Sequence, residues 1–249
     1  MYLLIVLISF YSHLAACYLD TKPDFVDSCY IKKPNFQECS TKSVQRLFSM
    51  LPPGIPSIGL QPLDPLHIPI VRILQGEGPV SVNASLANVT VLGFGGSRIL
   101  SNVVDPKTYD FHTKLVLPKL RIDGNYILLG RILLIPLRGR GKCWFEARDL
   151  NIYVKSDVNL IKKDNHHFYN VTGVHVKFTI GGLKLYMGNL FDGIKALEDS
   201  TNAYLNANWR PVADSLYPIL VRTIQDIMLD ILQRVFNNIP AEFFVPDVE

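Results

Sequence analysis

The sequence lacks the motifs that mark catalytic, metal-binding or membrane-spanning proteins. It contains no G-x-S-x-G nucleophile elbow, no dinucleotide-binding G-x-G-x-x-G pattern and no complete phosphate-binding loop. Its histidines have no cysteine or carboxylate at a familiar metal-binding spacing; His166-His167, after the polar stretch 162–165, predicts solvated side chains. Past residue 17, no apolar run is long enough to cross a bilayer. We therefore expect no catalytic residue, metal site, cofactor or transmembrane segment.

Charge and composition also exclude several classes of protein. The net charge is only +3, which gives no reason to expect nucleic-acid binding. There is no Gly/Ser-rich linker and no low-complexity tract, so residues 18–249 are expected to form one domain and to act as a monomer.

Residues 1–17 predict a signal peptide. A short apolar run, 3–10, is followed by Leu-Ala-Ala-Cys ending at Cys17, which resembles a signal-peptidase site. The same four residues also match a bacterial lipoprotein cleavage box. Asn-x-Ser/Thr sequons at Asn83, Asn88 and Asn170 instead favour a eukaryotic secretory route and are predicted glycosylation sites. We expect secretion into an extracellular fluid, with cleavage near Ala16 or Cys17.

Cysteine is scarce, with 4 residues in the chain. In an oxidising compartment, Cys29 and Cys39 are close enough in sequence to close a small loop. A disulfide there would contribute about 2–3 kcal/mol in the chain-entropy model. Cys143, beside Trp144 and Phe145, is either a buried, inert thiol or an intermolecular disulfide partner.

The longest helical pattern lies near the C-terminus, over residues 201–239. Apolar residues recur at steps of three and four and leave only a narrow polar edge, which includes Gln225 and Gln233. A continuous helix would be roughly 55 Å long. Pro218 predicts a kink or a restart, and an earlier segment capped at Asp199 or Ser200 is expected to end near Trp209. The helix is therefore expected either as one piece or as two.

The rest of the chain predicts mainly strands. A short helix with Val44, Leu47, Phe48 and Leu51 on one side is expected to start at residues 40–43 and to end at Pro52. Residues 55–67 predict an extended, proline-punctuated edge or connector. Strands are expected over 80–86, 89–92, 97–104, 108–116, 119–122, 126–136, 143–158 and 171–187. Alternation is clearest near residue 154, with Ile152, Val154, Val158 and Leu160 on one face.

Several ordered blocks resemble the takeout/juvenile-hormone-binding protein family of insects. They are Leu-Pro-Pro-Gly-Ile-Pro-Ser-Ile-Gly-Leu-Gln-Pro-Leu-Asp-Pro-Leu at 51–66, after the Cys29/Cys39 pair, Asn-Val-Thr-Val-Leu-Gly-Phe at 88–94, the glycine-bounded block 124–141, Asn-Leu-Phe-Asp-Gly at 189–193, Leu-Asn-Ala-Asn-Trp-Arg-Pro at 205–211, and 235–246. No single block is decisive, but the ordered set covers nearly the whole chain past residue 17.

The resemblance implies an α+β fold, in which a highly curved antiparallel β-sheet wraps a long C-terminal α-helix in a single domain. It also implies a secreted carrier that holds an elongated hydrophobic ligand, a juvenile hormone-like terpenoid or another lipid, in an internal tunnel. Takeout-like members act in circadian, feeding or chemosensory signalling. The hormone-binding branch has a second disulfide, whereas this chain has only Cys143 left over, so the resemblance leans toward the takeout-like branch.

Such a site needs apolar walls and a few polar groups. Tyr126 and Tyr204 are of interest because a buried phenol needs a hydrogen-bond partner, which a ligand oxygen can supply. The alternative for every candidate is ordinary packed core. The predicted ligand-binding residues are Phe48, Leu51, Tyr126, Leu128, Leu133, Ile135, Tyr204, Leu216, Leu220, Ile224 and Met228.

Two other functions remain open from the sequence. One is an extracellular interaction protein with a filled core that docks a receptor or membrane. Arg138, Arg140 and Lys142 alternate and therefore share one exposed strand face, which would serve that role. The other is a lipid hydrolase, which would release product from an ester ligand.

Overall fold

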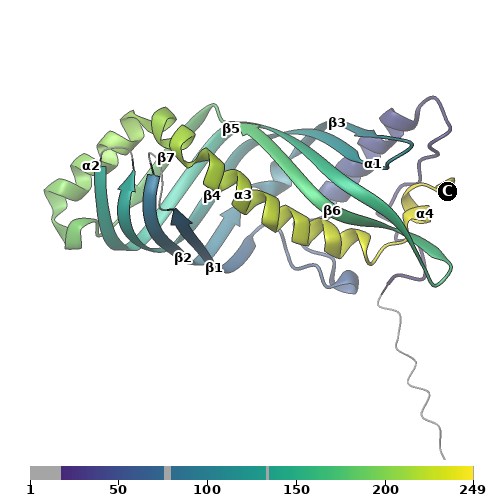
Figure 1. The fold of residues 1–249 in the computed structure, drawn as a ribbon, viewed down its shortest axis with the longest axis horizontal. Helices are drawn as coiled ribbons and strands as arrows, with labels where there is room; N and C mark the ends of the chain where they lie inside the picture. Colours follow the sequence, from purple (N-terminus) through teal and green to yellow (C-terminus); the bar gives the residue numbers. More distant parts are fainter. Residues whose placement is uncertain (1–17, 76–79, 133–134, 249) are drawn as a thin grey trace, which may run out of the picture.

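The fold consists of one strongly curved antiparallel sheet with helices packed against it (Figure 1). The computed structural model describes residues 18–75, 80–132 and 135–248, so the predicted signal peptide lies outside the described residues. The strand order is β1-β2-β4-β5-β6, with β3 paired to β4 and β7 paired to β5. The strands are β1 Leu66–Gln75, β2 Val80–Leu92, β3 Arg98–Val104, β4 Phe111–Ile132, β5 Ile135–Lys163, β6 His166–Thr179 and β7 Gly182–Met187. The helices are α1 Phe36–Met50, α2 Lys195–Ala207, α3 Trp209–Phe236 and α4 Ala241–Phe244.

Two very long strands, β4 and β5, pair with each other in the centre of the sheet. Most residues of three predicted strands, 108–116, 119–122 and 126–136, belong to the single strand β4, and Pro118 does not interrupt it. The last of these predictions continued past Ile132 into β5, which begins at Ile135. The reason lies in the pairing: β3 pairs with residues 111–116 of β4, and β2 pairs with residues 121–132 on the same side. Pro118 falls between the two partners, where its missing N–H costs no ladder hydrogen bond.

Strand β1 was missed because its sequence contains proline. The predicted edge or connector ended at residue 67, whereas the strand continues to Gln75. β1 lies at the end of the strand order and pairs with β2. An edge strand tolerates Pro69, because a proline there leaves no partner strand without a donor. The predicted strand 171–187 is likewise divided, into β6 and β7, at residues 180–181.

The predicted C-terminal helix is two helices. α2 ends at Ala207 and α3 begins at Trp209, so the break lies at Asn208, which confirms the predicted end of an earlier segment near Trp209; Pro218 lies inside α3. Pro211 lies in the first turn of α3, where a missing N–H leaves no helical bond unmade. α3 lies along the sheet beside β6 (Figure 1).

Side chains of the helices close three edges of the sheet. On the β3 edge, Gln37, Thr41 and Gln45 of α1, spaced four residues apart, accept backbone N–H bonds from Val104, Asn102 and Ile99. On the β7 edge, the amides of Asn202 and Asn206 of α2 each bond both the N–H and the C=O of one strand residue, Met187 and Leu185 respectively. These side chains replace a neighbouring strand.

The β6 edge is closed in the same way by α3. Gln225 accepts the N–H of Val176, and Gln233 donates to the carbonyl of Val171. Gln225 and Gln233, which belong to the predicted polar edge of the helix, are half-buried and form hydrogen bonds with the edge of the sheet.

The interior contains three apolar clusters. One lies between α1, α3, α4 and the β3–β6 part of the sheet, a second lies under β2, β4, β5 and β7, and a third joins the 55–63 segment to the end of α3. The predicted fold class is confirmed: a long C-terminal helix packs on a highly curved antiparallel sheet that does not close into a barrel. None of the described helices is long and apolar enough to span a bilayer.

Candidate functional site

The candidate site is a cavity of about 110 Å³ inside the first cluster. It lies at the end of the molecule that carries α1 and α4 (Figure 1). Walls come from α1, β3, β4, β5, β6, α3 and the C-terminal segment. The lining residues are Cys29, Phe36, Ser40, Ser43, Val44, Leu47, Phe48, Asn102, Val104, Phe111, Thr113, Leu115, Val154, Ser156, Tyr169, Met228, Leu232, Phe236, Phe244 and Val245.

Most polar side chains in this wall have hydrogen-bond partners within the protein. The amide of Asn102 donates to Ser40 Oγ over 2.7 Å, and Thr113 Oγ1 donates to Asn102 Oδ1 over 2.6 Å. Ser43 Oγ donates to the Asp27 carbonyl. A buried polar cluster whose members are all bonded does not need a ligand.

Tyr169 is the exception in this wall. Its side chain is 1% exposed, and its hydroxyl is buried without a hydrogen-bond partner among the described residues. Burial raises the pKa of Tyr169 well above its usual value, so the group is a neutral donor. An unmade bond of this kind costs about 1–3 kcal/mol, which a ligand oxygen would recover.

Among the residues that the structure describes, no charged side chain lines the cavity. An ionised carboxylate or ammonium would lose its hydration there without gaining a partner of opposite charge, which is strongly unfavourable. The walls therefore suit an uncharged, apolar molecule. The volume is below the roughly 300–1,000 Å³ typical of ligand pockets, so a long ligand requires side chains such as Met228 to change rotamer.

The structure places the sequence-predicted residues in four environments. Phe48 and Met228 line the cavity, and Ile224 packs against the same cluster. Leu51 packs against the third cluster. Tyr126, Leu128, Ile135 and Leu216 belong to or pack against the second cluster, and Tyr204 and Leu220 are exposed. Leu133 lies outside the described residues. The ligand-binding role of each remains a prediction.

The two tyrosines singled out by sequence differ from Tyr169. The Tyr126 hydroxyl donates to the Gly188 carbonyl over 2.9 Å, so this buried phenol already has a protein partner, and Tyr204 is 46% exposed. Sequence reasoning did not find Tyr169. Its ring contacts Tyr109, Phe111 and Phe236, which are distant in sequence, and no local pattern in β6 distinguishes it from a core residue.

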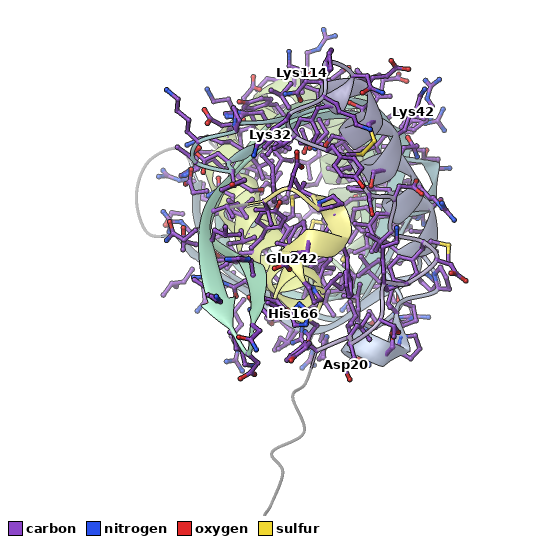
Figure 2. The ribbon with its side chains drawn as sticks, turned by 90° about the vertical axis from the view of Figure 1, so that its right-hand side faces the viewer. Asp20, Lys32, Lys42, Lys114, His166 and Glu242 are labelled. Atoms are coloured by element: carbon purple, nitrogen blue, oxygen red, sulfur yellow. A yellow bond between two sulfur atoms is a disulfide. The ribbon has the colours of Figure 1, made fainter. Side chains whose placement is uncertain are left out.

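The C-terminal segment closes one side of the cavity through Phe244 and Val245. Glu242 Oε1 accepts the backbone N–H of His167 at 2.7 Å and lies 2.8 Å from its ring Nδ1. Asp247 accepts the N–H groups of Ile31 and Lys32. Figure 2, a view toward this end, shows Glu242 and His166 close together beside α4; the Glu242 Oε2 to His166 Nδ1 distance is 3.9 Å.

These carboxylates predict that the C-terminal segment loosens in acid. Burial raises the pKa of Glu242 and of Asp247, but the hydrogen bonds that each carboxylate accepts lower the pKa by more than burial raises it. Both pKa values are therefore below their usual values of 4.5 and 3.8. A lowered folded-state pKa gives stability that is present above the unfolded value and lost as pH falls through the folded value.

We expect the hydrogen-exchange protection factors of residues 28–32 and 241–247, which compare each rate with that of an unfolded amide at the same pH, to fall below about pH 4. The Asp247→Asn variant should show faster exchange already at neutral pH. Asp230→Asn, on the exposed face of α3, is the control and should leave exchange of these segments unchanged. Equal exchange in Asp247→Asn and wild-type protein at neutral pH would contradict the prediction.

The three described cysteines are in two states: two form a disulfide and one is a free thiol. Cys29 and Cys39 form a disulfide that ties the cavity wall to α1. Cys143 is buried and is not in a disulfide among the described residues. Burial raises its pKa to about 11, so the inert thiol form holds at neutral pH.

The structure also gives the exposure of the predicted basic face and of the three sequons. Arg138, Arg140 and Lys142 are all exposed on one face of β5, as predicted. Asn83 and Asn88 are exposed and Asn170 is half-buried; their glycosylation remains a prediction. The described residues contain no cluster of His, Cys, Asp and Glu suited to a metal ion.

An apolar, uncharged cavity between a curved sheet and helices defines a binding protein for a small hydrophobic molecule. A model of the family described as haemolymph juvenile hormone binding protein matches residues 3–246, so the chain belongs to this family. In sequence it is similar to the "Circadian clock-controlled protein daywake" of Drosophila yakuba, with 25% identity over 86% of each chain. The Drosophila melanogaster protein of the same name is 24% identical, over 92% of this chain and 91% of that one.

Two further proteins are similar to this chain, one in sequence and one in structure. A "Putative beta-carotene-binding protein" of Schistocerca gregaria is 23% identical over 89% of this chain and 88% of its own length. The crystal structure of Epiphyas postvittana Takeout 1 superposes with a TM-score of 0.78, covering 88% of this chain and 99% of that one at 19% identity. This structural likeness confirms the fold.

Proposed function

We propose that this protein is a secreted carrier that holds one small, elongated and uncharged hydrophobic molecule, without catalysing its conversion. The observation that carries the proposal is the apolar cavity, whose wall includes Tyr169, a buried tyrosine with a hydroxyl that has no partner among the described residues. The ligand class is a terpenoid ester, ketone or alcohol, or another neutral lipid, with one oxygen that accepts a hydrogen bond from Tyr169. The ligand would enlarge the cavity toward a tunnel beside α3.

The family and its relatives support the carrier role. The family description names juvenile hormone binding, and the Schistocerca gregaria relative is named for β-carotene, another neutral isoprenoid. The two Drosophila relatives are named as clock-controlled, which supports a role in circadian or related feeding and chemosensory signalling. Delivery through haemolymph or another extracellular fluid is part of the proposal.

Native mass spectrometry of the protein secreted from insect cells tests the carrier function. We expect a discrete adduct of a small molecule that is lost on denaturation and recovered by organic extraction. Protein without an adduct should take up one equivalent of a neutral terpenoid ester and less of a fatty acid anion of similar length. If the protein shows no adduct and binds neither the terpenoid ester nor the fatty acid, this result would instead favour an interaction protein with a filled core. Product release from the ester would indicate a hydrolase.

Replacing Tyr169 with Phe tests the hydrogen bond to the ligand. Affinity for an ester or ketone ligand should fall roughly five- to tenfold, because one net hydrogen bond is worth about 1 kcal/mol. Affinity for a hydrocarbon of similar length should not change. The free energy of unfolding of the ligand-free protein should stay constant or rise, since the substitution removes a buried hydroxyl without a partner. Isothermal titration and chemical unfolding give both values.

Tyr126→Phe is the matched control. It removes a phenol that already donates to Gly188, so the expected pattern is reversed: stability falls by about 1 kcal/mol and ligand affinity does not change. Equal loss of affinity in the two variants would show that Tyr169 has no particular contact with the ligand.

A further inference from the structure

The outer face of the sheet carries an exposed apolar patch where β1, β2 and β4 run side by side. Leu74 is 82% exposed, Leu129 is 66% exposed and Ile127 is 63% exposed; Ile70 lies on the same face of β1 as Leu74, on the other side of Arg72, and completes the apolar patch. Alternation along the strands explains the placement, since Tyr126 and Leu128 point inward to the second cluster. Monomeric proteins rarely leave a contiguous apolar surface uncovered, so this face requires an explanation.

Asn83 stands in the middle of the apolar patch. In the register of the sheet it pairs with Leu74 of β1 on one side and with Leu129 of β4 on the other. Directly opposed residues in an antiparallel pair have Cβ atoms about 4.5–5.5 Å apart, on the same face. The exposed amide of Asn83 is therefore flanked by the two most exposed leucines of the patch.

Asn83-Ala84-Ser85 is also a sequon for N-linked glycosylation. The other two sequons lie elsewhere: Asn88 is at a bulge with a φ of 51°, and Asn170 is opposite Asn159 in the β5–β6 hairpin. Neither is paired with exposed leucines on both sides. The sequon at Asn83 thus differs from the other two in what an attached sugar would cover.

We propose that an N-linked glycan on Asn83 covers the apolar patch. Transfer joins Asn83 Nδ2 to the anomeric carbon of the first N-acetylglucosamine of a lipid-diphosphate-linked oligosaccharide. The lipid diphosphate leaves with the bonding electron pair, the amide loses one proton, and nothing is oxidised or reduced. The C–H faces of the first sugars then pack on Leu74 and Leu129, while their hydroxyl groups face water. The inference rests on the proposed secretion, because the donor is available on that route.

Glycopeptide mass spectrometry of the secreted full-length protein measures the occupancy of each sequon. We expect Asn83 to carry a glycan in most molecules. Glycans at Asn88 or Asn170 without one at Asn83 would show that the secretory route operates and would overturn the inference. Ligand adducts in native mass spectrometry are scored separately, so loss of this inference leaves the carrier proposal intact.

Two variants remove the glycan without touching the leucines, Asn83→Gln and Ser85→Ala. Both should lose the mass of one oligosaccharide, elute later from a hydrophobic-interaction column and self-associate at lower concentration in light scattering. Asn170→Gln is the control and should leave both elution and self-association unchanged. Adding Leu129→Thr to Asn83→Gln should restore early elution. Ligand uptake should not change, because the cavity lies at the other end of the sheet.

Two results would overturn the proposal. One is elution of Asn83→Gln and Ser85→Ala at the wild-type position. The other is an unmodified Asn83 in a secreted protein that binds vesicles of anionic phospholipid through the patch. Arg72, Arg131 and Arg138 are exposed on the same face, so vesicle binding that is lost in a Leu129→Asp variant would assign the face to a membrane.

Discussion

Replacing Met228 with Trp is expected to lower ligand affinity roughly a hundredfold or more. Met228 lines the cavity from α3, and the larger indole would occupy the space that a ligand needs. Excluding about 120 Å² of ligand surface from the cavity removes about 3 kcal/mol of binding free energy, which corresponds to this change in affinity. Overpacking should cost the fold only about 1–3 kcal/mol. Isothermal titration and thermal unfolding separate the two effects.

Leu220→Trp is the control for this experiment. Leu220 lies on the same helix but is exposed, so the indole should enter solvent and leave affinity and stability near wild type. Retained affinity in Met228→Trp, with a folded protein, would place the ligand outside this cavity. Loss of affinity in both variants would point to binding on the exposed face of α3.

Replacing Asn202 with Leu is expected to destabilise the protein by about 3 kcal/mol. The side chain of Asn202 bonds both the N–H and the C=O of Met187, and Leu keeps its size while leaving the two backbone groups buried without partners. Each unmade bond costs about 1–3 kcal/mol. For a chain of this length the melting temperature should fall by about 6–12 °C. Differential scanning calorimetry measures the shift, and ligand affinity of the folded protein should not change.

Asn208→Leu provides the comparison. Asn208 donates to the Tyr204 carbonyl at the junction of α2 and α3, where water can replace the lost bond, so the cost should stay below about 1 kcal/mol. Similar melting temperatures for Asn202→Leu and wild type would show that the β7 edge does not depend on the amide.

The fold could largely be predicted from sequence, because its signals are local. Helical spacing in 209–236 and alternation around Val154 specify the main helix and a central strand, and the ordered blocks specify the family. The errors occurred where a local rule was overridden by pairing. Pro118 is tolerated because it falls between the parts of β4 that pair with β3 and with β2, and Pro69 is tolerated because β1 is an edge strand.

The candidate site could be predicted less well. Phe48 and Met228 line the cavity, but they have the same helical spacing as residues that are packed or exposed, such as Leu216 and Leu220. Whether an apolar side chain borders empty space depends on how seven elements pack together. A local stretch of sequence carries no information about this packing. Tyr169 is distinguished by a missing partner, and a missing partner can be recognised only in three dimensions.

The helix amides that occupy the β3, β6 and β7 edges also limit how copies of this protein can meet. Exposed strand edges are templates for pairing with another chain, and three of them already have their hydrogen-bonding groups engaged by side chains of the same molecule. Of the described strands, β1 keeps a free outer edge, and Pro69 interrupts its row of donors. The protein is thereby protected against fibril growth through its sheet, and strand exchange between copies through the described edges would have to begin at β1.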